Sequence, residues 1–384
     1  MTDRIFLDAI TTTKPSGQCI QALLPFFETC FGSSSSPHQM GSEQLVHAEK
    51  SVAAIYDLFG AAADAQFVFT SSGAEAVSQV IMSVYRSVAR KLGKTHFVTR
   101  SIDEAPAIFA ISQLEEEECY LRMAHCSKEG YVTCEAVGDA ISPRTALVSM
   151  SLACGLTGVI QPVEEIAALC KERAILLHLD VTHAVGKLDV FLSHADCITC
   201  NGEQFHAPKG TGILLANKNF HLHPLIHGEG EQEQLRGGAL NVPMLASLGQ
   251  AALEAKQHQN LYCTEVARLR ALFELGIEEA YPEAQVLFQG SERLPHCTVV
   301  AFPGIHSELL AFALSRKGVY ACMGGGPFQQ MEKVLTACQV DPLLAQSALS
   351  FSLSKDTQEA EIERAIVLIA DVAKRLRRVS KAVV

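Results

Sequence analysis

The chain contains no tryptophan, few aromatic residues and little charge. Aromatic residues make up 7% and charged residues 19% of its 384 residues, while 48% are hydrophobic. This composition excludes a disordered, collagen-like or coiled-coil protein. Basic residues are also in deficit, because 31 Lys and Arg face 42 Asp and Glu, a formal net charge of -11. An acidic surface repels phosphate backbones, so we expect no nucleic-acid partner.

Long hydrophobic runs are lacking as well. The most apolar stretch, 146–163, is interrupted by polar residues and two glycines, whereas a spanning helix needs roughly 20 mainly apolar residues. Asp3 and Asp8 stand where a signal peptide would begin its apolar core. The 13 cysteines are scattered and odd in number, which favours buried thiols in a reducing cytosol over a disulfide framework. We therefore predict a cytoplasmic protein with no membrane segment.

Short apolar strands alternate with helices over the first 255 residues. The strands are expected at 67–70, 96–99, 146–152, 175–179, 197–200 and 212–216. Strands that are apolar on both faces indicate a mostly parallel sheet covered by helices on both sides. After residue 255 a long helical stretch leads into an α+β pattern. We predict an α/β fold with a large domain (14–255) and a smaller α+β domain (256–384 with 1–13).

A carboxylate flanked by two histidines follows one of these strands. His178 lies two residues before Asp180, and His183 lies three after it. His178 and Asp180 share one face of the strand, so two metal ligands are geometrically feasible. The sequence offers no compelling third ligand, and we predict no metal site. The end of a strand is also where α/β folds place groups that bind small ligands.

A series of short motifs extends nearly from one end of the chain to the other. They are Leu7, Asp8, Thr12 and Thr13; Gly32, Ser35, Ser36, His38 and Gly41; Phe69, Thr70, Ser71 and Glu75; Gly158, Gln161 and Pro162; His178, Asp180, Val185, Gly186 and Lys187; Pro208, Lys209 and Gly210; Arg236 and Gly238; Phe351 and Leu353. In this order they resemble the cysteine desulfurases, class V aminotransferases of fold type I that use pyridoxal phosphate (PLP). The resemblance implies a PLP-transferase-like fold, with a mostly parallel sheet and a smaller α+β C-terminal domain.

The stretch that should carry the reactive lysine departs from that family. The family has Ser-x-His-Lys ahead of Pro-Lys-Gly, where the lysine forms a Schiff base with PLP. Here Asn201, Gly202, Glu203 and Gln204 precede 208–210, so Gln204 stands at the lysine position. An amide nitrogen is not nucleophilic, and no covalent PLP is expected there.

Other positions to which the resemblance assigns cofactor or substrate contacts are also changed. Glu104 replaces the histidine that stacks on the ring, and Ala74 replaces a threonine that binds the phosphate. Gly155 lies in a Cys-Gly-Leu triplet that replaces Asn-Asn-Glu, and Ser350 replaces the arginine that binds the substrate carboxylate. Cys322 lies near, but not at, the position of the mobile-loop cysteine.

Some of the cofactor pocket is retained. Asp180 corresponds to the residue that pairs with the pyridinium nitrogen, and His183 replaces a glutamine there. The residual pocket is predicted to comprise Gly73, Ala74, Glu104, Gly155, Asp180, His183, Asn201, Glu203 and Gln204. We assign no catalytic residue from the sequence.

These departures favour a catalytically degenerate protein that acts as a binding or regulatory partner, in sulfur or iron–sulfur metabolism. Its predicted partners are a second copy or an intact desulfurase, and a sulfur-acceptor or iron–sulfur scaffold protein. One alternative is an enzyme that holds PLP or another small molecule non-covalently over Asp180, or that uses Lys209 for the Schiff base. Another is a rebuilt pocket of Glu104, His183, Glu203 and His206 that performs unrelated acid–base chemistry.

Overall fold

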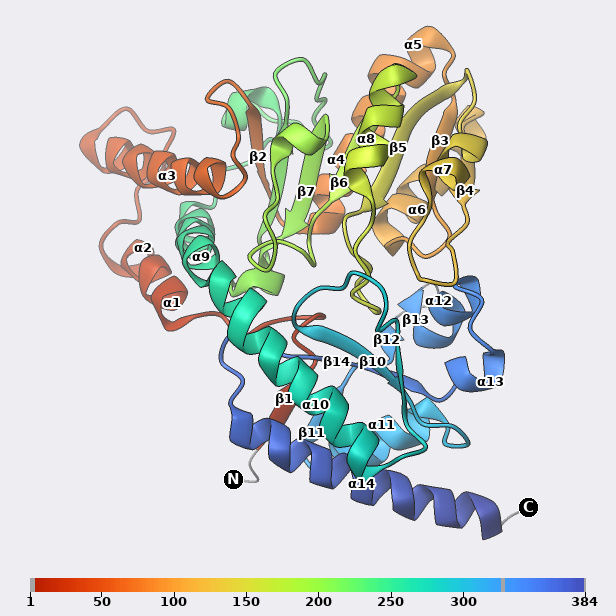
Figure 1. The fold of residues 1–384 in the computed structure, drawn as a ribbon. Coiled ribbons are helices and arrows are strands. Elements are labelled where there is room, and N and C mark those ends of the chain that lie inside the picture. Colours follow the sequence, from red (N-terminus) through yellow and green to blue (C-terminus); the bar gives the residue numbers. More distant parts are fainter. Residues whose placement is uncertain (1–3, 326–328, 383–384) are drawn as a thin grey trace.

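The central sheet has seven strands in a computed structural model that describes residues 4–325 and 329–382 (Figure 1). Its spatial order is β2–β8–β7–β6–β5–β3–β4. The strands are β2 (Gln66–Thr70), β3 (His96–Arg100), β4 (Tyr120–Ala124), β5 (Thr145–Ser151), β6 (Leu176–Asp180), β7 (Cys197–Asn201) and β8 (Gly212–Ala216). Only the pairings of β8 with β2 and β7 are antiparallel, so the predicted mostly parallel sheet is confirmed. The sequence analysis missed β4, because this edge strand is partly exposed and lacks a continuous apolar run.

Helices cover both faces of this sheet, with α8 in front of it and α4 and α6 behind it in Figure 1. The helices of this part are α1 (Gly17–Leu23), α2 (Pro25–Glu28), α3 (Gln39–Leu58), α4 (Gly73–Val84), α5 (Arg90–Leu92), α6 (Ala105–Ser112), α7 (Cys134–Ala140), α8 (Val163–Glu172) and α9 (Val242–Leu261). Two side chains cap the start of helix α4: Ser72 Oγ accepts from the Glu75 backbone N–H, and Glu75 Oε2 accepts from the Ser71 N–H. The cap fixes the turn between β2 and α4 beside the sheet.

The C-terminal part contains a second, smaller set of strands. Strands β9 (Gln285–Leu287), β10 (Cys297–Ala301) and β14 (Ala348–Ser352) form an antiparallel sheet, and β1 (Ile5–Leu7) pairs in parallel with β11 (Val319–Ala321). Short strands β12 (Gly324–Gly325) and β13 (Gln329–Gln330) pair with each other. The helices are α10 (Ala267–Ala280), α11 (Ser307–Ser315), α12 (Met331–Ala337), α13 (Pro342–Ala345) and α14 (Glu359–Ala382).

The N-terminal strand β1 pairs with β11 and packs with the C-terminal part. Ile5 and Leu7 share a buried hydrophobic cluster with side chains from 262–373. Helix α9, a π-helical turn (Tyr262–Val266) and α10 follow one another without a break and connect the two parts (Figure 1). Residue 255 lies within α9, and the division into domains at that residue stays a prediction.

The thiols and helices agree with the composition. All 13 cysteines are free thiols and ten are buried, as expected of cysteines that serve as small hydrophobic residues. In residues 4–325 and 329–382, no helix combines the length and the apolar character needed to cross a bilayer.

A candidate cofactor cavity at the carboxyl ends of the parallel strands

A cavity of about 340 Å³ lies where β6 and β7 end and α4 begins. Eight of the nine predicted pocket residues line it: Gly73, Ala74, Glu104, Gly155, Asp180, His183, Asn201 and Gln204. Cys322, Gly324 and Gly325 add a wall from the C-terminal part. The topology explains this gathering, because parallel strands deliver their carboxyl ends to one edge of the sheet.

Asp180 is the last residue of β6 and places a carboxylate on the cavity. Its Oδ1 accepts a hydrogen bond of 2.9 Å from the Thr182 backbone N–H. Burial raises the pKa of Asp180 to about 6, and nearby Glu104 adds to the rise, while Thr182 and His183 oppose it. The carboxylate is therefore held in the cavity at an energetic cost when it is charged.

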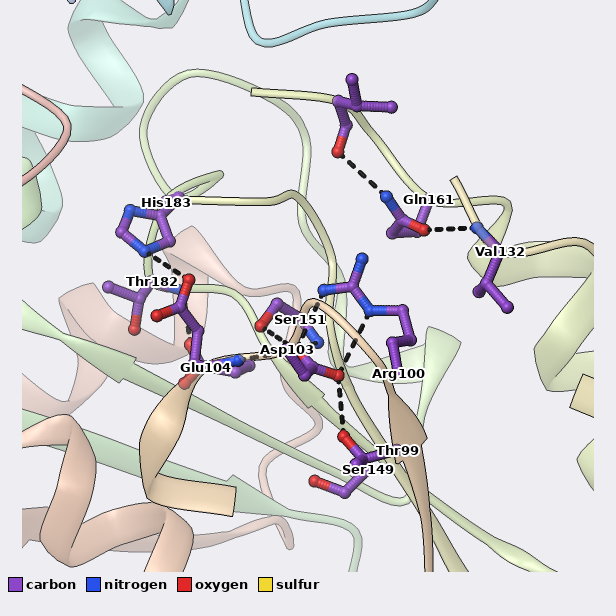
Figure 2. Close-up of polar contacts among 12 residues, drawn as sticks. Thr99, Arg100, Asp103, Glu104, Val132, Ser149, Ser151, Gln161, Thr182 and His183 are labelled. Atoms are coloured by element: carbon purple, nitrogen blue, oxygen red, sulfur yellow. Dashed lines mark hydrogen bonds and ion pairs between the residues drawn. The ribbon is translucent and has the colours of Figure 1, made fainter. Parts of the chain in front are cut away.

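Glu104 and His183 form a close pair in the cavity lining (Figure 2). Glu104 Oε1 lies 3.3 Å from His183 Nε2, and both side chains are largely buried. A Cβ atom at position 155 would clash with both of these atoms, so the pair occupies the space above Gly155. The buried Nδ1 of His183 has no hydrogen-bond partner among the described residues.

Gln204 lies in a 3₁₀ turn (Gly202–Phe205) directly after β7. Its Nε2 donates a 2.8 Å hydrogen bond to the Thr11 carbonyl, and its buried Oε1 has no partner in the described part of the chain. Lys187 lies behind this turn and donates a 2.5 Å hydrogen bond from Nζ to the Gln204 carbonyl. Burial lowers the pKa of Lys187 to about 7. Lys187 does not line the cavity.

Glu203 is the predicted pocket residue that does not line the cavity. Its carboxylate accepts hydrogen bonds from Thr12 Oγ1 at 2.9 Å and from Asn201 Nδ2 at 3.0 Å. Exposed Lys209 pairs with the same carboxylate at 3.4 Å and also lies outside the cavity. No lysine among the described residues lines the cavity, so a Schiff base on Lys209 is not supported by its position.

His206 lies on the other side of the turn after β7. Its Nδ1 lies 2.9 Å from the Lys14 carbonyl oxygen, and its Nε2 lies 3.3 Å from the Tyr262 hydroxyl. His206 adopts a positive φ of 71°, which turns the chain away from the cavity. The grouping of Glu104, His183, Glu203 and His206 into one pocket is therefore wrong.

Cys322 follows β11 and contributes its thiol to the cavity. Its Sγ lies 3.4 Å from Thr11 Oγ1 and accepts a 3.3 Å hydrogen bond from the Gly324 N–H. Burial, followed by the charge of Asp8, raises the pKa of the thiol to about 11. A nucleophilic cysteine needs the opposite shift, because the thiolate is the reactive form.

A buried ion pair beneath the cavity was not predicted from the sequence (Figure 2). Arg100 Nη2 lies 2.9 Å from Asp103 Oδ1, and both side chains are 2% exposed. Ser151 donates to the same oxygen from its N–H at 2.9 Å and from its hydroxyl at 2.6 Å. Asp103 also accepts from the Glu104 N–H, at 3.2 Å, and thereby fixes the backbone of a cavity residue. An arginine at a strand end was the only local signal, and it did not indicate its partner.

His178 belongs to this buried framework rather than to the cavity. Its ring nitrogens lie 2.8 Å from Ser149 Oγ and 2.9 Å from Thr199 Oγ1. Burial lowers the pKa of His178 to about 4, so the ring is neutral near pH 7. Two neutral hydroxyl partners make it a core residue between β5 and β7. In the described residues, no group of three or more His, Cys, Asp or Glu side chains is placed to hold a metal ion.

Several residues that line the cavity were absent from the sequence prediction. They are Thr11, Ser72, Pro106, Thr182, Gly324 and Gln329. Thr11 comes from the N-terminal segment and Gln329 from the C-terminal part, and no local pattern indicates that they meet. Thr182 had a usable signal, since it follows Asp180 within the same loop.

The sheet order and the carboxylate at the end of β6 beside the capped start of α4 define the fold-type I class of PLP-dependent proteins. The aminotransferase class-V family model matches residues 5–364. The chain is 33% identical to a cysteine desulfurase of Bradyrhizobium diazoefficiens, covering 99% of this chain and 97% of that protein. It is 31% identical to the cysteine desulfurase NifS of Azotobacter vinelandii, covering 98% and 94% respectively.

The solved structures give the same result. A structure described as a NifS-like protein matches with a TM-score of 0.91 at 26% identity, covering 97% of this chain and 100% of that chain. The predicted fold-type I architecture is thereby confirmed. The chain belongs to the cysteine desulfurase family within aminotransferase class V.

The residues present do not fit the covalently held PLP of that family. Gln204 stands at the position that the resemblance assigns to the lysine, its amide donates to the Thr11 carbonyl, and the described lysines lie outside the cavity. The Glu104–His183 pair replaces an aromatic ring-stacking partner with a carboxylate. Asp180 remains as a partner for a ring nitrogen. We therefore derive no reaction step through PLP.

Proposed function

We propose that this protein is a catalytically silent member of the cysteine desulfurase family that acts as a binding or regulatory partner. The observation that carries the proposal is Gln204 at the Schiff-base position, in a cavity that no described lysine lines. Transamination and desulfuration of the family type both begin with a covalent bond to PLP, which an amide cannot form.

The sulfur-carrying half of the family reaction lacks support as well. Cys322 is the described cysteine that lines the cavity, and the pKa of its thiol is raised to about 11. A thiol in that state is a poor acceptor of a sulfur atom from a substrate. Ser350, at the position of the carboxylate-binding arginine, is buried in β14, and its Oγ lies 3.5 Å from Cys297 Sγ.

A protein partner is supported by apolar surface around the first three helices. Phe27 and Phe31 are 64% and 70% exposed, and Ile20, Leu24 and Met40 are also exposed. Exposed apolar clusters of this kind mark protein interfaces. We propose that this surface joins a second copy or an intact desulfurase, in a cytoplasmic assembly that also engages a sulfur-acceptor or iron–sulfur scaffold protein. Sedimentation that shows only monomer at micromolar concentration, alone and with an intact desulfurase, contradicts this part.

The decisive experiment asks whether the purified protein forms an aldimine. The protein is incubated with PLP, reduced with borohydride and examined by intact mass, while sulfide release from cysteine is measured in parallel. We expect neither a reduced adduct nor sulfide, because no lysine among the described residues lines the cavity. A desulfurase with the lysine intact is the positive control. Sulfide release by this protein overturns the proposal.

A second candidate is an enzyme that binds PLP or another small molecule non-covalently over Asp180. It is favoured by the retention of Asp180 at the end of β6 and by the cavity of about 340 Å³. Equilibrium dialysis with PLP separates the candidates, because non-covalent binding leaves bound cofactor that borohydride does not fix. If PLP is retained in this way, the second candidate replaces the first.

A further inference from the structure

The carboxylates that line the cavity are not balanced by lysine or arginine side chains. Asp180 and Glu104 supply carboxylates, and no Lys or Arg among the described residues lines the cavity. Arg236, the guanidinium near α4, is engaged by Glu75 at 3.1 Å and is not part of the lining. The cavity therefore differs in charge from one that holds a phosphorylated cofactor, whose phosphate is dianionic near pH 7.

Gln204 provides an independent observation. The side chain lines the cavity, is 6% exposed, and leaves Oε1 without a partner among the described residues. Its Nε2 is already used by the Thr11 carbonyl, which fixes Oε1 as the free end. A buried amide oxygen without a partner costs about 1–3 kcal/mol, so a ligand that donates a hydrogen bond relieves that cost.

His183 supplies a second buried acceptor without a described partner. Its Nε2 lies 3.3 Å from Glu104 Oε1, and its buried Nδ1 has no described partner. When the proton is on Nε2 and points to the carboxylate, Nδ1 is an acceptor. Gln204 Oε1 and His183 Nδ1 are then both buried acceptors without a described partner.

The start of α4 does not reverse this preference. A free helix N-terminus favours anions, but Glu75 already places its carboxylate in the first turn of α4 and accepts from the Ser71 N–H. Ser72 Oγ caps the same turn. The Glu75 carboxylate thus already compensates part of the positive charge at this end of the helix.

We propose that this cavity binds a small cationic amine, either an alkylammonium or an amidinium-type group, and has lost the preference for an anionic phosphorylated cofactor. The cation is held by Asp180 and Glu104, and one of its N–H groups donates to Gln204 Oε1. This inference rests on the proposed function, because it requires a cavity without PLP. It names the ligand class that the regulatory site takes.

The test is titration calorimetry on the full-length protein with matched probes. Agmatine and n-butylamine carry the cationic group, whereas n-butanol, butyrate and inorganic phosphate are neutral or anionic controls. We expect the two amines to bind and to raise the melting temperature, and the controls to do neither. The absence of binding by both amines overturns the inference, as does phosphate or PLP that binds more tightly than either amine.

Three variants locate the binding site. Asp180→Asn and Glu104→Gln each keep side-chain size, and each should weaken amine binding about 10-fold, because each removes a charge-assisted hydrogen bond. Gln204→Met removes the acceptor and should weaken binding about 3- to 10-fold. Asp196→Asn is the matched control, since Asp196 also accepts a backbone N–H, that of Leu177 at 2.8 Å, but does not line the cavity.

The outcomes separate the two proposals. Amine binding that is unchanged in both Asp180→Asn and Glu104→Gln places the site elsewhere and overturns the inference. Circular dichroism of each variant shows whether it folds, and Glu104→Gln decides if Asp180→Asn does not. A borohydride-reduced PLP adduct overturns the proposed function, whereas an absence of amine binding without an adduct overturns only the ligand class.

Discussion

The Asp103 carboxylate and the cavity beside it differ in how completely their buried acceptors are hydrogen-bonded. In the framework, the Asp103 carboxylate accepts six hydrogen bonds, from Thr99, Arg100, Glu104 and Ser151. In the cavity, His183 Nδ1 and Gln204 Oε1 are buried without described partners.

Paired buried groups stabilise the fold, whereas unpaired ones are expected where a ligand binds. Buried polar groups are normally paired because an unpaired one costs free energy. The Asp103 carboxylate obeys this rule and links β3 to β5, although Arg100 Nη1 beside it is buried without a described partner. The cavity departs from the rule at His183 Nδ1 and Gln204 Oε1, where a ligand is expected.

The largest effect is expected when the framework pair is broken. Asp103→Ala leaves Arg100 as an uncompensated buried charge, so the free energy of unfolding should fall by about 3–5 kcal/mol. Urea unfolding followed by circular dichroism measures it. The double variant Asp103→Ala with Arg100→Met should recover part of the loss. A fall below about 1 kcal/mol for the single change contradicts the role assigned to the pair.

Acidification should lower the free energy of unfolding through His178 and raise it through Asp180. The folded-state pKa of His178 is about 4, below its ordinary value of 6.5, so its contribution to stability is lost as pH falls through this window. The loss reaches up to about 3 kcal/mol. The folded-state pKa of Asp180 is about 6, above 3.8, so its contribution rises as pH falls from 6 to 4.

Unfolding free energies measured from pH 7 to 4 test these signs. Relative to the wild type, His178→Asn should flatten the loss on acidification, and Asp180→Asn should steepen it. Both variants are compared with the wild type at each pH. Shifts in the same direction for His178→Asn and Asp180→Asn contradict the contrast.

A smaller effect is expected for Asp180→Asn at pH 7. The charged carboxylate is disfavoured by burial, and removal of its charge should raise the free energy of unfolding by about 1–2 kcal/mol. The same change weakens the proposed amine binding. A residue that costs stability but is needed for a ligand is expected at a functional site. Thermal unfolding without added amine measures the gain, and a loss of stability contradicts this account.

The smallest effect is expected for Gln204→Lys, which should not restore sulfide release. A lysine would supply the attachment for PLP, but Ala74, Glu104 and Ser350 stand at positions to which the resemblance assigns contacts with cofactor and substrate that these side chains do not supply. Each missing contact costs roughly 1–3 kcal/mol, and several together reduce a rate by many powers of ten. Sulfide production with added PLP is the measurement. Turnover by this single variant shows that the rest of the site is intact.

The fold and most of the cavity could be predicted from the sequence. Period and composition indicated strands such as 67–70 and 212–216, and the structure places both within one residue of those limits at β2 and β8. The motif order identified the family, and eight of nine predicted pocket residues line one cavity. These features are local or fixed by motif order, because strand ends and loops carry their residues to a known edge of the sheet.

Only the tertiary structure decided which side chains meet. His206 and Glu203 follow β7 as Gln204 does, yet the 3₁₀ turn sends His206 toward Tyr262 and Glu203 toward Thr12. The hydrogen bonds from Ser151 to Asp103 and the free acceptor on Gln204 likewise depend on chain segments far apart in the sequence. The sequence by itself determined the helices and strands, through local conformational preference. It also determined that an amide, Gln204, stands where the resemblance expects a lysine. The direction of each side chain after a turn depends on backbone dihedrals that packing sets, and so it was decided by the folded structure.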